Sequence, residues 1–511
     1  MPASPLVIAV DSSTTATKAL ILNDEGEVHA AGRADIRLHT PQLSRYEHDP
    51  LDWWRSTDVA IGQAIAALAA PDRSRVSALC ITPQRQSFAL VADDGSAIRP
   101  GILWLDGRAV AEVAELGSGQ VHALSGFQPD VTPSLYKIAW LARHEPEALR
   151  RADKVVGVHG YLCHALTGSW VDSAACADSL GLFDMAQLTW SPELLDMAGL
   201  RPDQLPDLVA PGAVVGEVTS DHRARWGLPG PVTVVAGCGD GQAAGLGCGA
   251  VHPDEAYLNL GTAIVAGVHS RQYRHGDSYR TDAAGLPGQF VLEIVQNSGA
   301  YLAGWFRSEL GDPALDGRPD PALESAAAKV APGVGGLVTL PYWNAAQSPH
   351  WNPVARGAIV GLAGQHGRPE LYRSLLEGLC LETARNLGAL QADTGVPLTS
   401  VRVMGGGQRS ALWRRIMTDA VGLPLTACAT EEVSALGAGM LAVAHHSGAS
   451  IKETSTRMAR PSDVTAPDPG TTAVYAELGA IQGGLYQRLR ETFEQQYRFA
   501  ATHPLGGHAL N

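Results

Sequence analysis

Strand-like apolar runs alternate with helical patterns along the first half of the chain. The apolar runs are LVIAV, ALIL, VSALCIT and ADKVVGVHGYL, and the helical stretches between them include DVAIGQAIAALAA and YKIAWLARHEPEALRRA. The first two runs are followed by the turn signal NDEGE. Strands that alternate with helices predict an α/β protein.

The second half of the chain begins with the same pattern as the first. AYLNLGTAIVAGV at 256–268 has the strand, hydroxyl-containing turn and strand of VIAVDSSTTATKALIL at 7–22. This weak internal repeat predicts two related domains. We expect them to span 1–250 and 251–495, and we expect 496–511 to form a mobile tail.

Composition excludes several classes of partner. The formal net charge is -14 and basic residues do not gather in runs, which argues against nucleic acid or an anionic membrane as partner. Seven scattered cysteines without a CxxC pair favour a reducing compartment. The sequence shows neither a signal peptide nor a long apolar span. We therefore expect a cytoplasmic protein.

Three turns rich in glycine or hydroxyl groups follow apolar strands: 12–18, 261–262 and 405–407. Such turns direct backbone N–H groups into an anion-binding concavity, and Lys18 adds a positive charge to the first. Each turn alone is an ordinary connection, but three in one chain favour a polyphosphate ligand. None is a GxxxxGK[ST] motif. Asp11, which ends the first strand, suits either Mg²⁺ or a local Asx turn.

Asp240 lies in the glycine turn GCGDGQAAG after a buried strand. Phosphoryl transfer to an alcohol needs a carboxylate that orients the hydroxyl and accepts its proton, and glycines leave room for substrate. Two other interpretations remain open. One is turn chemistry, and the other is a GxGxxA dinucleotide fingerprint, which would indicate a nicotinamide-dependent oxidoreductase.

A second polar group is predicted in the first half. Gln84, Arg85 and Gln86 follow one strand, and WLDGR at 104–108 follows another. Trp104 offers an apolar face for carbon atoms, and fixed donors and acceptors suit the hydroxyls of a polyol. Surface ion pairs and a core tryptophan are the alternative.

Nine segments, in this order, resemble the FGGY family of carbohydrate kinases from about residue 6 to 490. They are VDSSTTATK, YEHDPLDWW, LWLDGR, PSLYKIAWLARH, GCGDGQAAG, LNLGT, RGAIVGLAGQHGRPELYRSLLEG, GGGQRSALW and ALGAGMLA. The resemblance implies a two-domain, actin-like ATPase fold of the ribonuclease H-like kind, with a cleft between the domains. It implies ATP as phosphate donor with Mg²⁺, and it suggests a homodimer.

The resemblance also implies roles for single residues. Asp240 would be the general base and Asp11 would lie near Mg²⁺. The sugar would be faced by Gln84, Arg85, Gln86, Trp104 and Asp106. The nucleotide would be held by Thr14, Thr15, Lys18, Gly261, Thr262, Gly405, Gly406, Gly407, Gln408 and Ser410.

The substrate is less clearly marked than the reaction. SPHWNP at 348–353 and LNLGTA are more similar to xylulose kinases than to glycerol kinases, whereas QRQ at 84–86 is closer to the glycerol kinase pattern. Gly241 and Thr132 stand where relatives carry larger side chains. We expect conversion of D-xylulose to D-xylulose 5-phosphate. Ribulose, glycerol, erythritol and gluconate are the alternative substrates, and a non-catalytic sugar sensor is the alternative function.

Overall fold

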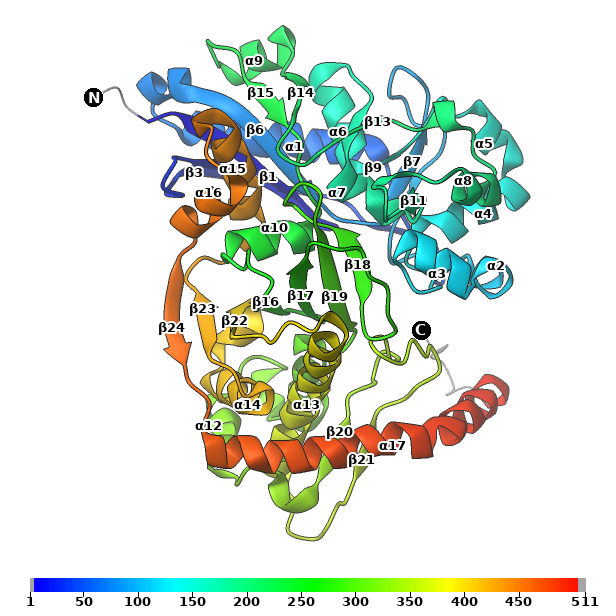
Figure 1. Cartoon of the computed structure of the whole chain (residues 1–511), viewed down its shortest axis with the longest axis vertical. Coiled ribbons are helices and arrows are strands. Elements are labelled where there is room, and N and C mark those ends of the chain that lie inside the picture. Colours follow the sequence, from blue (N-terminus) through cyan, green and yellow to red (C-terminus); the bar gives the residue numbers. More distant parts are fainter. Residues whose placement is uncertain (1–3, 504–511) are drawn as a thin grey trace.

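The computed structural model describes residues 4–503, which form two halves, each built around one main sheet (Figure 1). The first sheet has the strand order β14-β15-β6-β1-β2-β3. Its strands are β1 (Leu6–Ser12), β2 (Ala16–Leu22), β3 (Val28–Asp35), β6 (Val76–Pro83), β14 (Val214–Glu217) and β15 (Thr233–Val235).

The second sheet has the order β18-β19-β17-β16-β22-β23-β24. Its strands are β16 (Glu255–Leu260), β17 (Ile264–Ser270), β18 (Arg280–Ala283), β19 (Phe290–Gln296), β22 (Ser400–Met404), β23 (Leu425–Cys428) and β24 (Pro461–Thr465).

Each of the two sheets contains five strands in the same arrangement. In the first, β3, β2 and β1 form an antiparallel meander, and β6 and β15 continue parallel to β1. In the second, β19, β17 and β16 form the meander, and β22 and β23 continue parallel to β16. The sequence repeat is therefore a repeat of strand order. The carboxyl ends of the parallel strands lie at one edge of each sheet, where α/β proteins place ligands.

Helices bury both faces of the first sheet. Leu6, Ile8 and Val10 of β1 pack on the side of α1 (Pro50–Ala67) and α6 (Val158–Thr167), whereas Val7 and Ala9 pack on the opposite side. This is the two-residue period of a strand that is buried on both faces. The opposite side is covered by α15 (Val433–Ser447), which lies beside β1 and β6 (Figure 1). A segment from late in the sequence thus completes the core of the first half.

Two helices cross closely where the halves meet. α10 (Asp240–Gly247) packs against α15. A Cβ atom at Gly437 would lie 1.9 Å from the carbonyl oxygen of Ala243, and one at Gly247 would lie 2.0 Å from that of Val433. Only glycine allows these backbones to approach so closely.

Smaller elements complete the first half. A five-stranded sheet contains β4 (His39–Gln42), β5 (Arg45–His48), β8 (Gly101–Ile102), β7 (Phe88–Val91) and β9 (Lys154–Gly157), and two short pairs are β10 (Val171–Ser173) with β13 (Asp207–Val209) and β11 (Phe183–Asp184) with β12 (Thr189–Trp190). The remaining helices are α2 (Val110–Leu116), α3 (Gly119–Ser125), α4 (Ser134–His144), α5 (Pro146–Arg151), α7 (Ala174–Ala177), α8 (Pro192–Ala198) and α9 (Ser220–Trp226).

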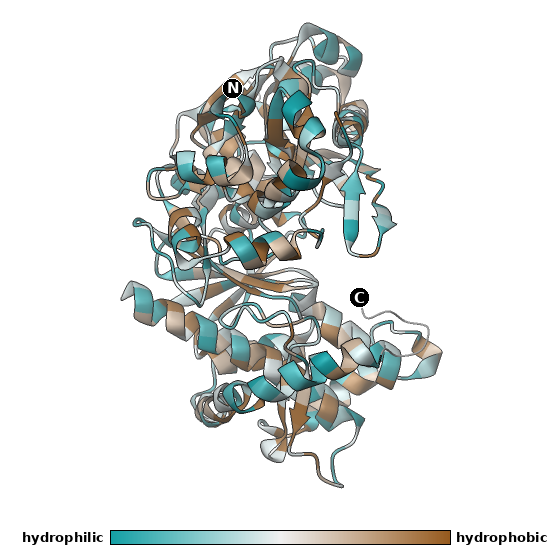
Figure 2. Cartoon of the chain, turned by 90° about the vertical axis from the view of Figure 1, so that its right-hand side faces the viewer, coloured by the Kyte–Doolittle hydropathy of each residue, from teal (hydrophilic) through white to brown (hydrophobic). Residues whose placement is uncertain are grey.

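Helices also surround the second sheet, whose strands are hydrophobic, while the outer helices show hydrophilic residues (Figure 2). They are α11 (Ala300–Leu310), α12 (Pro321–Lys329), α13 (Arg368–Thr394), α14 (Ala411–Val421) and α17 (Pro469–Thr502), with the short strand pair β20 (Val338–Leu340) and β21 (Ala358–Val360). The remaining helix, α16 (Ile451–Met458), packs instead against α15 and α10.

The final helix, α17, extends to Thr502, so the beginning of the predicted 496–511 tail is helical. Residues 504–511 lie outside the described part. Among residues 4–503, no helix has both the length and the apolar character needed to cross a membrane.

Candidate active site

The turn after β1 brings together residues from three predicted groups. Thr14 Oγ1 donates to Gln84 Oε1 at 3.2 Å and accepts from Trp104 Nε1 at 3.0 Å. The neighbouring Thr15 is exposed. Trp104 has 38% of its surface exposed beside this turn. The predicted phosphate loop and part of the predicted sugar site are therefore adjacent.

Lys18 faces Asp11 across the β1–β2 hairpin and reaches the second half of the chain. Its Nζ donates to both carboxylate oxygens of Glu432, at 2.7 and 2.8 Å. Glu432 immediately precedes α15. Since both side chains are about one-third exposed, the pair contributes little to stability. The sequence did not reveal Glu432, because 414 residues separate it from Lys18.

Asp240 is the first residue of α10, and its Oδ1 accepts from the backbone N–H of Gly241 at 2.9 Å. Burial raises the pKa of Asp240; the positive charge of Arg85 opposes this shift and the negative charge of Glu293 adds to it. Asp11 is the second-last residue of β1. Burial, with a contribution from Asp240, raises the pKa of Asp11 to about 7.

The two acids have the character of a cation site. Asp11 Oδ1 is buried and has no hydrogen-bond partner among the described residues. Each carboxylate at this edge is destabilised by burial, and Asp240 raises the pKa of Asp11 further. A divalent cation would relieve both effects, and carboxylate oxygens are the ligands that Mg²⁺ prefers. The residues present therefore fit Mg²⁺.

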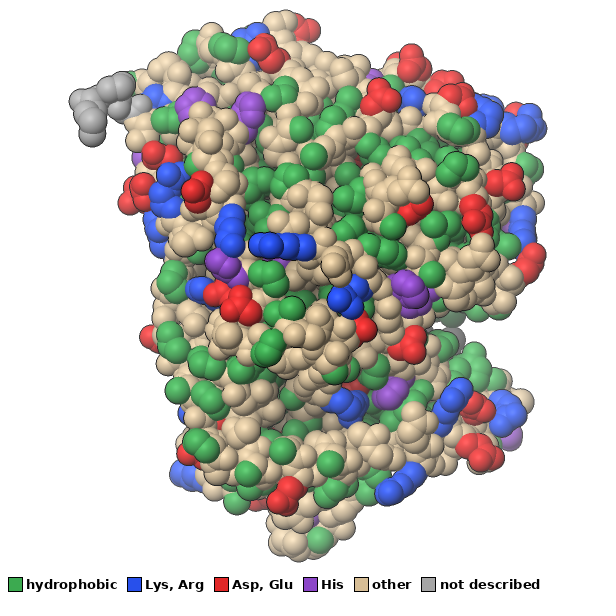
Figure 3. Space-filling view, viewed as in Figure 1, with side chains coloured by type: hydrophobic (Ala, Val, Ile, Leu, Met, Phe, Trp, Pro, Cys, Tyr) green, Lys and Arg blue, Asp and Glu red, His purple; other side chains and the backbone are tan. Residues whose placement is uncertain are grey.

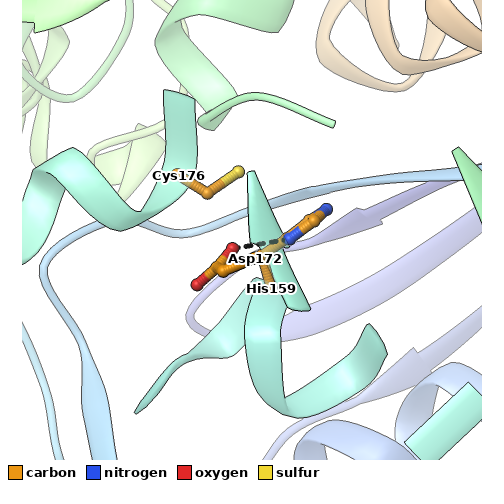
Figure 4. A group of neighbouring side chains, drawn as sticks. All are labelled: His159, Asp172 and Cys176. Carbon is orange, nitrogen blue, oxygen red and sulfur yellow. Dashed lines mark hydrogen bonds and ion pairs between the residues drawn. The ribbon is translucent and has the colours of Figure 1, made fainter. Parts of the chain in front are cut away.

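A buried histidine holds the turn that leads to Asp240. His159 Nδ1 lies 2.7 Å from Asp172 Oδ1, and the backbone N–H of Gly237 donates to His159 Nε2 at 3.1 Å (Figure 4). Cys176 lies close by, so these three side chains have the spacing of a metal site. Since both ring nitrogens already have protein partners, we assign the group to positioning, with the ring proton on Nδ1.

Further hydrogen bonds fix the same turn. The donors and acceptors are Ser173 Oγ to Gly237 O at 2.5 Å, Thr82 Oγ1 to Cys238 O at 2.8 Å, and Gly239 N to Ala175 O at 3.0 Å. Asp240 is thus presented on a backbone whose polar groups are satisfied on several sides. Such support pre-organises a catalytic group.

Arg85 ties the two halves together beneath this turn. Its Nη2 lies 2.9 Å from Asp178 Oδ2, in the first half, and 3.0 Å from Asp282 Oδ1, in β18 of the second half. All three side chains are buried. The Arg85 chain packs against Gly239, where a Cβ would lie 2.4 Å from Arg85 Cδ. The sequence analysis predicted Arg85 to face the sugar and did not reveal its two acidic partners.

A neighbouring carboxylate occupies the space that a side chain at Gly241 would need. A Cβ at this position would lie 2.8 Å from Glu293 Oε2. Glu293 is buried and is held by Tyr257, whose hydroxyl donates to Oε2 at 3.0 Å, and by Arg280, whose Nε donates to Oε1 at 2.7 Å. Glu293 from β19 therefore leaves no room for a larger residue directly after Asp240.

Gln86 and Asp106 occupy constrained positions. Gln86 has a φ of 59°, and its buried Nε2 has no partner among the described residues. Asp106 is fully buried, and both of its oxygens accept from Arg108, while Oδ2 also accepts from the backbone N–H of Tyr46. Gln86 therefore stays a predicted sugar contact with an amide nitrogen that is free within the described part of the chain, whereas the hydrogen bonds of Asp106 fix its own loop.

The second half contributes two glycine turns. Gly261 and Thr262 lie between β16 and β17. Gly405, which follows β22, has a φ of 85°, and a Cβ there would lie 2.3 Å from Asn259 Oδ1. A Cβ at Gly407 would lie 2.7 Å from Trp413, whereas Gly406 has open space around it. Contacts within the protein therefore require glycine at 405 and 407, and Gly406 leaves open space beside the backbone.

Two predicted nucleotide residues support the second glycine turn. The amide of Gln408 exchanges two hydrogen bonds of 3.2 Å with the backbone of Cys428. Ser410 caps α14 by accepting from the N–H of Trp413 at 3.0 Å, and its hydroxyl donates to Glu324. Both side chains are engaged in holding the turn.

Comparisons with known proteins agree with this arrangement. The sequence model described as the FGGY family of carbohydrate kinases, N-terminal domain, matches residues 6–247, and the C-terminal domain model matches 256–446. The chain is 32% identical to a xylulose kinase of Escherichia coli over 445 residues, which cover 86% of this chain and 89% of that protein.

Other relatives carry different names. A glycerol kinase of Bordetella parapertussis is 29% identical over 467 residues, with 86% of this chain and 89% of that protein covered. The crystal structure of a xyloylose kinase from Brucella ovis superposes with a TM-score of 0.90 at 26% identity, covering 95% of this chain and 100% of the other.

Proposed function

The chain belongs to the FGGY family of carbohydrate kinases, and it is therefore a phosphotransferase that acts on a sugar and a nucleotide; we propose that it transfers the γ-phosphate of ATP to a terminal hydroxyl of D-xylulose. The fold is the two-domain, actin-like ATPase fold. The single observation that carries the proposal is the pair of acids, Asp11 and Asp240, at one edge of the first sheet beside the hydroxyl-rich turn.

Asp240 is proposed as the general base. Its carboxylate starts α10, and burial raises its pKa, which makes the carboxylate a stronger base. It orients the sugar hydroxyl for in-line attack and accepts its proton late in the transfer. The positive charge of Arg85, which is buried beneath the turn, acts in the opposite direction to burial and lowers the pKa of Asp240.

Asp11 is proposed to hold Mg²⁺. Asp240 is close enough for its negative charge to raise the pKa of Asp11. A bound Mg²⁺ ion would neutralise negative charge on the ATP phosphates. Lys18 contributes a second positive charge at the same hairpin, and its pairing with Glu432 holds it across the two halves. Thr14 and Thr15 provide hydroxyls and backbone amides for phosphate oxygens.

The second half is proposed to receive the rest of the nucleotide. Gly261 and Thr262 offer backbone N–H groups to the phosphates. The turn at 405–407 offers a surface without side chains on which the nucleoside can lie. Gln408 and Ser410 act by holding that turn, as their hydrogen bonds to Cys428 and α14 indicate.

D-xylulose is favoured over glycerol by two features. The chain is slightly more similar to a xylulose kinase than to a glycerol kinase. The segment 348–353, which resembles that of xylulose kinases, packs beside β19: Ser348 exchanges two hydrogen bonds of 3.1 Å with the backbone of Val295. β19 also carries Glu293 beside Gly241. The sugar is proposed to contact Gln84, Arg85, Gln86 and Trp104.

The proposal is tested by ADP release from MgATP with a panel of sugars and polyols. The panel contains D-xylulose, L-xylulose, D-ribulose, L-ribulose, glycerol, erythritol and gluconate. We expect D-xylulose to give the highest kcat/KM. A preference for glycerol or gluconate would keep the mechanism and overturn the substrate. Sugar binding without ADP release from any of them would overturn the kinase assignment and favour a sensor.

A further inference from the structure

A cavity of about 520 Å³ lies at the junction of the two halves, away from Asp240. Its wall comes from the β13–β14 connection at Gly212, the segment after α10 at Val251, the β18–β19 connection at Leu286, the end of α15 at Leu441 and the start of α16 at Ile451. The cavity is therefore bounded by elements whose relative position changes if the halves move.

The lining combines an apolar wall with positive charge. Arg271 and Lys452 line the cavity together with His445, and no Asp or Glu side chain lines it. Within residues 4–503, neither Arg271 nor Lys452 forms an ion pair or a side-chain hydrogen bond. Figure 3 shows Lys or Arg side chains and a histidine on the surface below α15 and α16, with acidic side chains beneath them. In a chain with a net charge of -14, an acid-free wall with unpaired cations attracts an anion.

Two helices run from the candidate active site to this cavity. α10 begins with Asp240, and the chain reaches the cavity at Val251 soon after the helix ends. α15 begins next to Glu432, the partner of Lys18, and its last turns line the cavity at Leu441 and His445. Because glycines let the two backbones touch, a change in the position of one helix is transmitted to the other.

We propose that this cavity is a second ligand site that takes a small organic anion with an apolar body, and that its occupation alters nucleotide binding through α10 and α15. The anionic group pairs with Arg271 and Lys452, and the apolar body contacts the wall formed by Leu286, Leu441 and Ile451. The site is separate from the proposed sugar and nucleotide residues.

Binding is tested with the fluorescent probe 1-anilinonaphthalene-8-sulfonate, which has an aromatic body and one negative charge. The probe is titrated into the full chain with MgATP at saturation, so that the nucleotide site is filled. We expect saturable binding that weakens about tenfold in the double variant Arg271→Ala/Lys452→Ala, because two charge-assisted contacts are lost. The matched control Arg37→Ala/Arg488→Ala, which removes two exposed charges elsewhere, retains wild-type affinity.

Two further measurements test whether the probe binds in this cavity and through its negative charge. Ala449→Phe, which fills part of the cavity from its rim, should also weaken probe binding while thermal unfolding stays unchanged. Octanoate should displace the probe, whereas neutral octanol should not. Equal affinity in the wild type and the Arg271/Lys452 variant, or equal displacement by both compounds, would overturn the anion site.

Coupling to the nucleotide is tested by calorimetry. The Kd for MgATP is measured with and without saturating octanoate, and we expect a change of about fivefold in the wild type, within the usual range of allosteric coupling. The Arg271→Ala/Lys452→Ala variant should show none. A wild-type Kd that octanoate leaves unchanged would overturn the coupling, and this outcome is independent of which sugar the enzyme phosphorylates.

Discussion

The hairpins β1–β2 and β16–β17 occupy the same place in their sheets and differ in charge. Each has a three-residue turn, 13–15 in the first and 261–263 in the second. The second-last residue of the strand before the turn is Asp11 in the first hairpin and Asn259 in the second. The same backbone frame thus carries an acid in one half and a neutral amide of nearly equal size in the other.

This difference in charge suggests that the two hairpins contact different ligands. Asp11, whose pKa burial raises to about 7, suits a cation in the first half. Asn259 lies close to both glycine turns of the second half, since Cβ atoms at Gly261 and Gly405 would lie 3.2 and 2.3 Å from its Oδ1. In the proposed arrangement a second carboxylate there would face the phosphates. We therefore infer that the two similar hairpins differ in their ligand, and that Asp11 makes the first one the metal-binding hairpin.

The largest effect is expected from Asp240→Asn, which removes the proposed base and keeps the shape of the side chain. We expect kcat to fall by about 10²–10⁴-fold, the usual contribution of general base catalysis. The KM for ATP should change little, since we propose that the two hairpins, and not Asp240, hold the nucleotide. Steady-state kinetics with the exposed Asp221→Asn as control makes the test, and near-wild-type turnover would remove Asp240 from the mechanism.

Asp11→Asn makes the first hairpin resemble the second. We expect kcat to fall by roughly 10²-fold and the Mg²⁺ concentration for half-maximal activity to rise, as a charged ligand is lost. An unchanged Mg²⁺ dependence would place the metal elsewhere.

The same Asp11→Asn variant should alter the pH dependence of stability. Because the folded-state pKa is about 7, above the ordinary value, the folded state binds more protons between about pH 4 and 7 and wild-type stability falls as pH rises through that window. The Asn variant lacks this loss. We expect it to be more stable by on the order of 1–3 kcal/mol at pH 8, with the gain fading towards pH 5. Urea unfolding at both pH values measures the free energy, and an equal gain at each would contradict the raised pKa.

The converse exchange, Asn259→Asp, gives the second hairpin the acid of the first. We expect MgATP to bind about tenfold more weakly, because a carboxylate then faces phosphate oxygens. D-xylulose affinity should be unaffected. Calorimetric titration of each ligand separates the two effects, and a loss confined to the sugar would show that this hairpin does not serve the nucleotide.

His159→Ala tests whether the buried histidine positions the Asp240 turn. We expect kcat to fall about fivefold with KM for ATP unchanged, as the acceptor for the Gly237 N–H is lost and the base is misplaced. His159→Gln, which keeps a side-chain acceptor, should recover part of the loss. If both variants lose stability and retain kcat, the histidine is structural only.

The smallest effect is expected from Lys18→Met. Its ion pair with Glu432 is partly exposed, so the free energy of unfolding should change by less than about 1 kcal/mol. The KM for ATP should nevertheless rise about threefold, since a charge near the phosphates is lost. Thermal unfolding and kinetics are compared with Lys329→Met, an exposed lysine on α12. An effect on stability without one on KM would make Lys18 a connector of the halves.

Local patterns predicted much of the fold and the site. The strand–turn–strand repeat was visible because alternating apolar residues and hydroxyl-rich turns are properties of neighbouring positions. Asp240 and Arg85 were found in the same way, from turns after buried strands. In contrast, Asp178 and Asp282 meet at Arg85 from segments about a hundred residues apart, and no local pattern marks such a pair.

Other features depended on tertiary packing. α15 lies within the predicted second domain, and its contact with the first sheet could not be predicted because it depends on how the two halves pack. Asp106 matched a sugar-site motif, but burial beside Arg108 commits both of its oxygens. Gly241 stands where relatives carry a larger side chain, and Glu293, 52 residues later in the sequence, occupies the adjacent space.

The most direct measurement is phosphorus NMR of the protein mixed with MgATP and D-xylulose. Our account predicts a phosphomonoester signal of D-xylulose 5-phosphate that grows in step with ADP, and both signals should grow about 10²–10⁴-fold more slowly with the Asp240→Asn variant. Growth of ADP together with free inorganic phosphate and no sugar ester would contradict transfer to the sugar.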